Sequence, residues 1–222
     1  MQAEFDEGKF NLIYNDKTLI SGESITLKTS TGELLSQTFS TSNIQNNGIK
    51  TFNLRSKDAH SETEIEVTCH EQTAVIRFGA KILEKEPVFG KQKFLAEKSA
   101  VTMSCISQNA GPYTAVYQHK EWWIRPAFCK KIQDIPKKTQ LLLWKTDDTY
   151  FVMLAVCGKQ NRADLCGKAN GFTISLSTNC SGIRDCSDVA AVITCGENPY
   201  YCIHAARRLK MFLPQWHLLK SR

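Results

Sequence analysis

The order of apolar and polar residues in the first half of the chain is typical of antiparallel strands. Apolar or β-branched residues recur at every second position or in short runs. Turn-forming Asn, Asp, Gly, Ser and Pro residues separate these segments. The pattern predicts strands at residues 10–14, 24–29, 51–56, 63–70, 73–83 and 101–107.

The second half continues with heavier strands. Residues 139–145 and 150–157 are apolar on both faces, which indicates central strands between two packed layers. Only after residue 196 does the period change to a helical one, with Tyr200, Ile203, His204 and Leu209 on one predicted face. We therefore expect an all-β fold. It would be a large antiparallel β-sandwich over residues 1–196, with a short C-terminal helix and tail over 197–222.

Composition excludes several classes of partner. The chain has 222 residues, 42% hydrophobic and 23% charged, as in an ordinary globular protein. The net charge of +6 comes from scattered basic residues, so no nucleic-acid partner is expected. No window has the ~18 continuous apolar residues of a membrane span, so no membrane partner is expected. The acidic N-terminus shows no signal peptide; this favours the cytoplasm, while a secreted or periplasmic location stays open if a signal has been removed.

The nine cysteines predict buried thiols and no metal site. Their number is odd, most lie in strand-like runs, and none forms a C-x-x-C pair. No glycine loop for phosphate and no G-x-S-x-G motif is present, so neither a cofactor nor a nucleophilic serine is expected.

One aromatic cluster carries more information about function. Trp122 and Trp123 precede Arg125 in a predicted strand. An exposed indole can stack on the C–H face of a sugar, and a neighbouring guanidinium can donate to hydroxyls. The alternative is that both indoles seal the sandwich against a neighbouring loop. For Trp144, at the end of an apolar strand, a core position is expected.

An ordered series of landmarks runs through residues 110–207. It consists of Trp122-Trp123 with Pro126 and Phe128, Ile135-Pro136, Thr139-Gln140, Leu142-Leu143, Tyr150-Phe151-Val152 with Leu154, Arg162-Ala163 with Leu165 and Gly167, Ser181-Gly182, Ala190-Ala191, Gly196–Tyr200 and Ala205-Ala206. This series resembles the N-terminal domain of the raffinose synthase and seed-imbibition group of glycoside hydrolase family 36, which includes alkaline α-galactosidases. The first hundred residues match only in strand rhythm.

The resemblance implies a galactose-mutarotase-like supersandwich placed before a catalytic barrel. In that family two aspartates of the barrel carry out retaining chemistry on α-galactosides, and the nucleophile lies in a Lys-x-Asp motif. Lys145-Thr146-Asp147 has this form, yet it follows a sandwich strand and opens a turn. We therefore expect no catalytic residue here, and no hydrolysis or galactosyl transfer by this chain alone.

Two functions follow as hypotheses. In the first, the chain is the non-catalytic β-sandwich of such an enzyme. It would support a catalytic barrel and contribute Trp122, Trp123 and Arg125 to an α-galactoside site, with residues 197–222 leading toward the barrel. In the second, it is a free-standing carbohydrate-binding or protein-interaction module.

Overall fold

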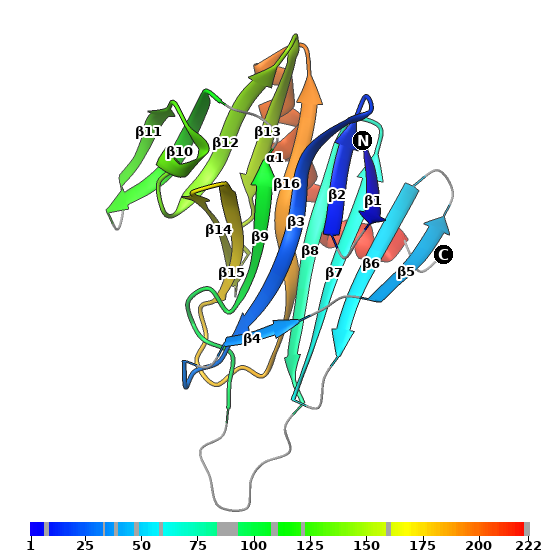
Figure 1. The fold of residues 1–222 in the computed structure, drawn as a ribbon, viewed down its shortest axis with the longest axis vertical. Coiled ribbons are helices and arrows are strands. Elements are labelled where there is room, and N and C mark those ends of the chain that lie inside the picture. Colours follow the sequence, from blue (N-terminus) through cyan, green and yellow to red (C-terminus); the bar gives the residue numbers. More distant parts are fainter. Residues whose placement is uncertain are drawn as a thin grey trace, which may run out of the picture.

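The alternating sequence forms antiparallel strands throughout. The computed structural model describes residues 1–6, 9–32, 34–37, 40–46, 49–57, 60–83, 93–107, 111–120, 123–158 and 161–219, arranged as in Figure 1. The elements are β1 (Gln2–Asp6), β2 (Lys9–Tyr14), β3 (Lys17–Lys28), β4 (Leu34–Gln37), β5 (Ser40–Asn46), β6 (Ile49–Lys57), β7 (Ser61–His70), β8 (Thr73–Ile82), β9 (Val101–Ser107), β10 (Tyr113–Lys120), β11 (Trp123–Cys129), the 3-10 helix η1 (Ile132–Asp134), β12 (Thr139–Thr146), β13 (Thr149–Ala155), β14 (Asn161–Lys168), β15 (Gly171–Thr178), β16 (Asp185–Gly196) and α1 (Pro199–Leu219).

Hydrogen-bonded pairing joins these strands into two layers that are continuous at one edge. The order is β1-β2-β3-β9-β15-β14 in one layer and β12-β13-β16-β8-β7-β6-β5 in the other. The layers connect between β14 and β12, which share only the pair Thr139 and Leu165. In addition, β4 pairs with β3, β10 pairs with β12, and β11 pairs with β10. The predicted antiparallel β-sandwich with a C-terminal helix is confirmed.

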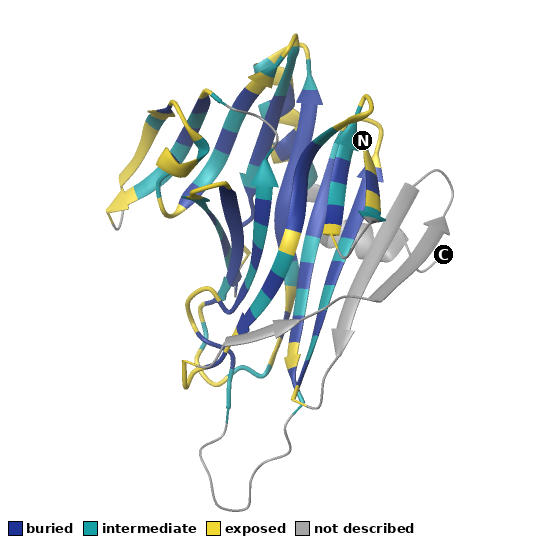
Figure 2. Cartoon of the chain, in the orientation of Figure 1, coloured by how far each residue is buried: buried dark blue, intermediate teal, exposed yellow. Residues whose placement is uncertain are grey.

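The core lies between the two layers, as the period of two requires. In β7, Ile65 and Val67 are fully buried while Glu64 and Glu66 point to the other side. This alternation is visible as bands along the strands in Figure 2. Residues of both layers share one cluster, which includes Leu12, Ile25, Ile65, Phe78, Met153, Phe172 and Ile174. Trp144 is also buried here, as expected.

A second, smaller cluster lies on the outer side of β8, β16 and β13, beneath α1. Cys202 and Ala206 of the helix pack there with Val152 and Val192, which explains why β13 and β16 are apolar on both faces. The helix begins at Pro199, and the Asn198 side chain accepts a hydrogen bond from the Tyr200 amide at 2.9 Å. None of the helices in the described residues has the length and apolar character needed to cross a membrane.

Candidate functional site

Two of the three predicted sugar-binding residues lie on an exposed strand. β11 pairs only with β10 among the described strands, so its other edge is free. Trp123 is 64% exposed, and Arg125 is exposed two positions further, on the same side of the strand. Trp122 lies outside the described residues. The exposure of Trp123 argues against its sealing the sandwich, while its part in sugar binding stays a prediction.

The opposite side of β11 is apolar and also exposed. Ile124 is 68% exposed and Phe128 84% exposed. Across the sheet, Pro126 of this side lies in one row with Val116, Leu141, Leu154 and Val192. Val192 is buried beneath α1 at the other end of that row. We call the row formed by these five residues and flanked by Ile124 and Phe128 the apolar strip. In the described part of the chain, Val192 belongs to the cluster beneath α1, Leu154 and Leu141 pack against that cluster, and the strip is exposed at Ile124 and Phe128.

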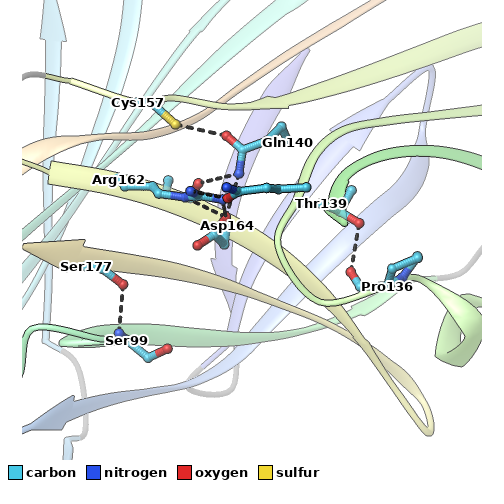
Figure 3. Close-up of polar contacts among 10 residues, drawn as sticks. Ser99, Pro136, Thr139, Gln140, Cys157, Arg162, Asp164 and Ser177 are labelled. Atoms are coloured by element: carbon cyan, nitrogen blue, oxygen red, sulfur yellow. Dashed lines mark hydrogen bonds and ion pairs between the residues drawn. The ribbon is translucent and has the colours of Figure 1, made fainter. Parts of the chain in front are cut away.

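A network of polar side chains crosses from β10 and β12 to β14 (Figure 3). Arg162 donates from Nε and Nη2 to Oδ1 of Asp164, at 3.1 and 2.9 Å. Its Nη1 donates to Oε1 of Gln118 at 2.5 Å. Gln140 donates to the same Oδ1 of Asp164, and its Oε1 accepts a hydrogen bond from the thiol of Cys157 at 2.8 Å. The guanidinium is therefore held in one orientation by two different strands.

The environment of Asp164 balances burial against cationic neighbours. Loss of solvation by burial raises the pKa of this carboxyl above its usual value. The hydrogen bond and charge of Arg162, and the charge of Lys138, oppose that increase. Asp164 is thus a partly desolvated carboxyl group, and its cationic neighbours favour its charged form.

Beside this network lies a hollow of about 750 Å³. Its floor is the outer side of β9, β15 and β14, and loop residues 97–99 and 137–138 form its walls. The floor carries hydroxyl groups that are ordered by neighbours: Ser175 accepts a hydrogen bond from Thr102 at 3.2 Å, and Ser177 accepts one from the amide of Ser99 at 2.7 Å. We call this space the basic hollow, because it is lined by Lys98, Lys137, Lys138, Arg162 and Lys168.

The Lys-x-Asp sequence lies at a different place, in the turn between β12 and β13. Thr146 and Thr149 form the last pair of this hairpin, so Asp147 is a turn residue with a φ of 53°. Lys17 pairs with Asp147 at 2.5 Å, and this contact lowers the pKa of the carboxyl. The expectation that the motif ends one sandwich strand and opens a turn into the next is confirmed.

The thiols are mostly inaccessible. Six of the nine cysteines are buried, and Cys157, Cys166 and Cys180 are partly exposed. Burial raises the pKa of Cys186 to about 12 and that of Cys195 to about 11, so neither is a nucleophile at neutral pH. Within the described residues no group of three or more His, Cys, Asp or Glu side chains could hold a metal ion.

No protein-family model matches the chain, and no curated protein matches it either. Among solved structures it is similar to the α-N-acetylgalactosaminidase NagBb from Bifidobacterium bifidum, with a TM-score of 0.53 and 10% sequence identity. The match covers 93% of this chain and 36% of that one. The likeness shows a shared fold. Another match is the GH36 α-galactosidase AgaB from Geobacillus stearothermophilus, with a TM-score of 0.43, 9% identity, and coverage of 78% of this chain and 30% of that one.

The similarity therefore concerns only one part of the NagBb chain. This chain spans about a third of the length of the glycosidase chains to which it is similar. The arrangement of its strands follows one portion of NagBb, and the remainder of NagBb has no counterpart within the 222 residues.

Proposed function

We propose that this chain is the non-catalytic β-sandwich of a raffinose synthase or α-galactosidase-like glycosidase. It supports a catalytic barrel and contributes Trp122, Trp123 and Arg125 to an α-galactoside site. The observation that carries the proposal is the NagBb match, which takes in nearly all of this chain but only a third of a glycosidase.

The apolar strip supports a docking role. Surface area of this kind usually marks a site of contact with another domain or protein. Here the surface continues from the residues already buried beneath α1 to the exposed Phe128, so a docked barrel would extend an existing interface.

The environment of Asp147 supports the absence of catalysis by this chain. A retaining glycosidase needs a nucleophilic carboxylate and an acid/base carboxyl about 5–5.5 Å apart, at least one of them shielded. Asp147 is instead a solvent-exposed turn residue that pairs with Lys17.

Binding and turnover can be measured on the same preparation. Isothermal titration calorimetry with methyl α-galactoside and raffinose is expected to show weak binding that Trp123→Ala abolishes. Phe128→Ala is the control, because it removes an exposed ring from the other side of the same strand. No release of nitrophenol from p-nitrophenyl α-galactoside is expected. Turnover that disappears in Asp147→Asn would overturn the non-catalytic assignment, and equal binding by wild type and Trp123→Ala would overturn the sugar site.

The docking role has its own test. Immunoprecipitation from the native source, followed by mass spectrometry, is expected to recover barrel peptides of the α-galactosidase type, in the same chain or an associated one. Recovery of this 25.0 kDa chain without such peptides would favour the free-standing module instead. The exposed Trp123 on a free edge favours that second function, and galactoside binding would then be its whole activity.

A further inference from the structure

The basic hollow has the dimensions of a small-molecule site and lies apart from the proposed α-galactoside site on β11. Ligand pockets usually have volumes of ~300–1,000 Å³, and this hollow measures about 750 Å³. Its floor belongs to paired strands: β15 pairs with β14 along its whole length and with β9 from Gly171 to Leu176. Side chains on such a floor keep fixed spacings, which a binding site requires.

The charges around the hollow are unequal. Five cationic side chains line it, against the carboxylates of Glu97 and Asp164. Asp164 already accepts hydrogen bonds from Arg162 and Gln140. Among the described residues, no ion pair within 4 Å joins Lys98, Lys137 or Lys138 to a carboxylate. The hollow therefore has a positive field available to an anion.

Arg162 is prepared to bind such an anion. A guanidinium has five N–H donors, and the contacts with Asp164 and Gln118 use one on each of its three nitrogens. The second hydrogens of Nη1 and Nη2 are left for a ligand, and 28% of the side chain is exposed. Because its orientation is fixed beforehand, little side-chain entropy is lost on binding.

The backbone at both walls adopts a conformation that L-residues usually avoid. Ser99 has a φ of 51° and Lys138 a φ of 61°. Gly or Asn adopts this left-handed region more easily, and strained residues of this kind concentrate at functional sites. The carbonyl of Lys138 accepts the amide hydrogen of Gln118, whose side chain holds Arg162. One residue of β10 thus ties the lysine turn to the guanidinium.

The lining chemistry selects the class of ligand. Hydroxyls of Ser99, Thr102, Thr173, Ser175 and Ser177 can exchange hydrogen bonds with a polyol, and the described lining residues include no aromatic ring. In its described lining the hollow therefore lacks the apolar ring face on which a neutral sugar could stack. We propose that the basic hollow binds a small anionic saccharide, a polyol with a single phosphate, sulfate or carboxylate group, whose oxyanion lies between Arg162 and the turn of Lys137 and Lys138.

Calorimetry at low salt with galactose 1-phosphate, inorganic phosphate and galactose tests the proposal. We expect galactose 1-phosphate to bind most tightly, and its affinity to fall on raising the salt concentration. A double Lys137→Gln/Lys138→Gln variant should bind about fivefold to tenfold more weakly, because each removed cation contributes modestly at a partly exposed site. Lys81→Gln is the charge-matched control, since Lys81 is exposed on β8 in the other layer. The same ligands are also titrated into Trp123→Ala, in which the proposed α-galactoside site on β11 is lost, so that the binding that remains reports the basic hollow alone.

Lys138→Gly gives a second measurement that loss of structure would not imitate. It should leave the melting temperature unchanged or raise it, because glycine relieves the backbone strain, and yet weaken binding. Three results would overturn the proposal: equal affinity for inorganic phosphate or galactose, equal loss in Lys81→Gln, and full binding by the double variant.

Discussion

Gly171 lies in β15 directly against the backbone of β9, and its substitution is expected to destabilise the fold severely. A Cβ added there would lie 1.9 Å from the carbonyl oxygen of Cys105, whereas real Cβ contacts essentially never fall below 3.0 Å. The obstacle is backbone, so no side-chain rotation can relieve it. In Gly171→Ala the strands must separate at the pair Gly171 and Ile106.

The size of the effect follows from that separation. Forced overpacking costs about 1–3 kcal/mol, and each ladder hydrogen bond that is lengthened beyond its normal range adds about 1 kcal/mol. We expect the free energy of unfolding to fall by about 2–4 kcal/mol, a large part of the ~5–15 kcal/mol that stabilises a typical domain. With a urea m-value of about 2 kcal/mol/M, the unfolding midpoint should fall by about 1–2 M.

Urea titration followed by tryptophan fluorescence measures this difference, with Gly79→Ala as the matched control. A Cβ at Gly79 would meet the Cβ of Glu64 at 3.6 Å, an ordinary contact. That variant should be unchanged or stabilised by about 0.5 kcal/mol, because alanine loses less backbone entropy on folding. If Gly171→Ala unfolded at the same urea concentration as Gly79→Ala, the close approach of β9 and β15 described here would be wrong.

Two further predictions concern titrating groups. Because Lys17 lowers the pKa of Asp147, their interaction stabilises the fold above the usual carboxyl pKa and is lost as pH falls through the lowered pKa. In Lys17→Gln, carbon-13 NMR should show the pKa of Asp147 rising toward its usual value. An unchanged pKa would refute the pairing. In the folded chain, dithionitrobenzoate at mildly alkaline pH should quickly label only the partly exposed Cys157, Cys166 and Cys180. After denaturation it should label all nine cysteines. Fast labelling of Cys186 in the folded chain would contradict the burial of its thiol.

The alternation of residues predicted the sandwich and many of its strands, because burial of one face of a strand imposes a period of two. It did not predict β1, β4, β5, β10 or β14, nor the first half of β3. The helix shows where such reasoning fails. Tyr200, Ile203, His204 and Leu209 were expected to share one face of α1. Ile203 and Leu209 pack against the cluster on the sheet, whereas Tyr200 is 76% exposed and His204 is also exposed. The small residues Cys202 and Ala206 face the sheet instead, because they let the helix backbone approach β13 and β16 closely.

The basic hollow could not be recognised from the sequence. Its cationic residues come from three separate segments, at Lys98, at Lys137-Lys138 and along β14, and so they looked scattered. The pairing of β14 with β15 and of β15 with β9, together with the bridge between Thr139 and Leu165, brings these segments together. One local indication was available: Arg162 and Asp164 alternate along a strand whose other side is apolar, so both had to share the outer face.

The free edge of β11 also affects how the protein behaves at high concentration. A strand that is paired on one edge only, with Ile124 and Phe128 in solvent, is a template on which other chains could add strands. Pro126 stands between these two residues and has no N–H group to donate. Proline is tolerated in sheets where its nitrogen faces away from the paired strand, which here is β10. The backbone N–H that Pro126 lacks is therefore missing from the open edge of β11. An incoming strand would find its central hydrogen bond missing, and the proline thereby protects an apolar edge from fibril growth.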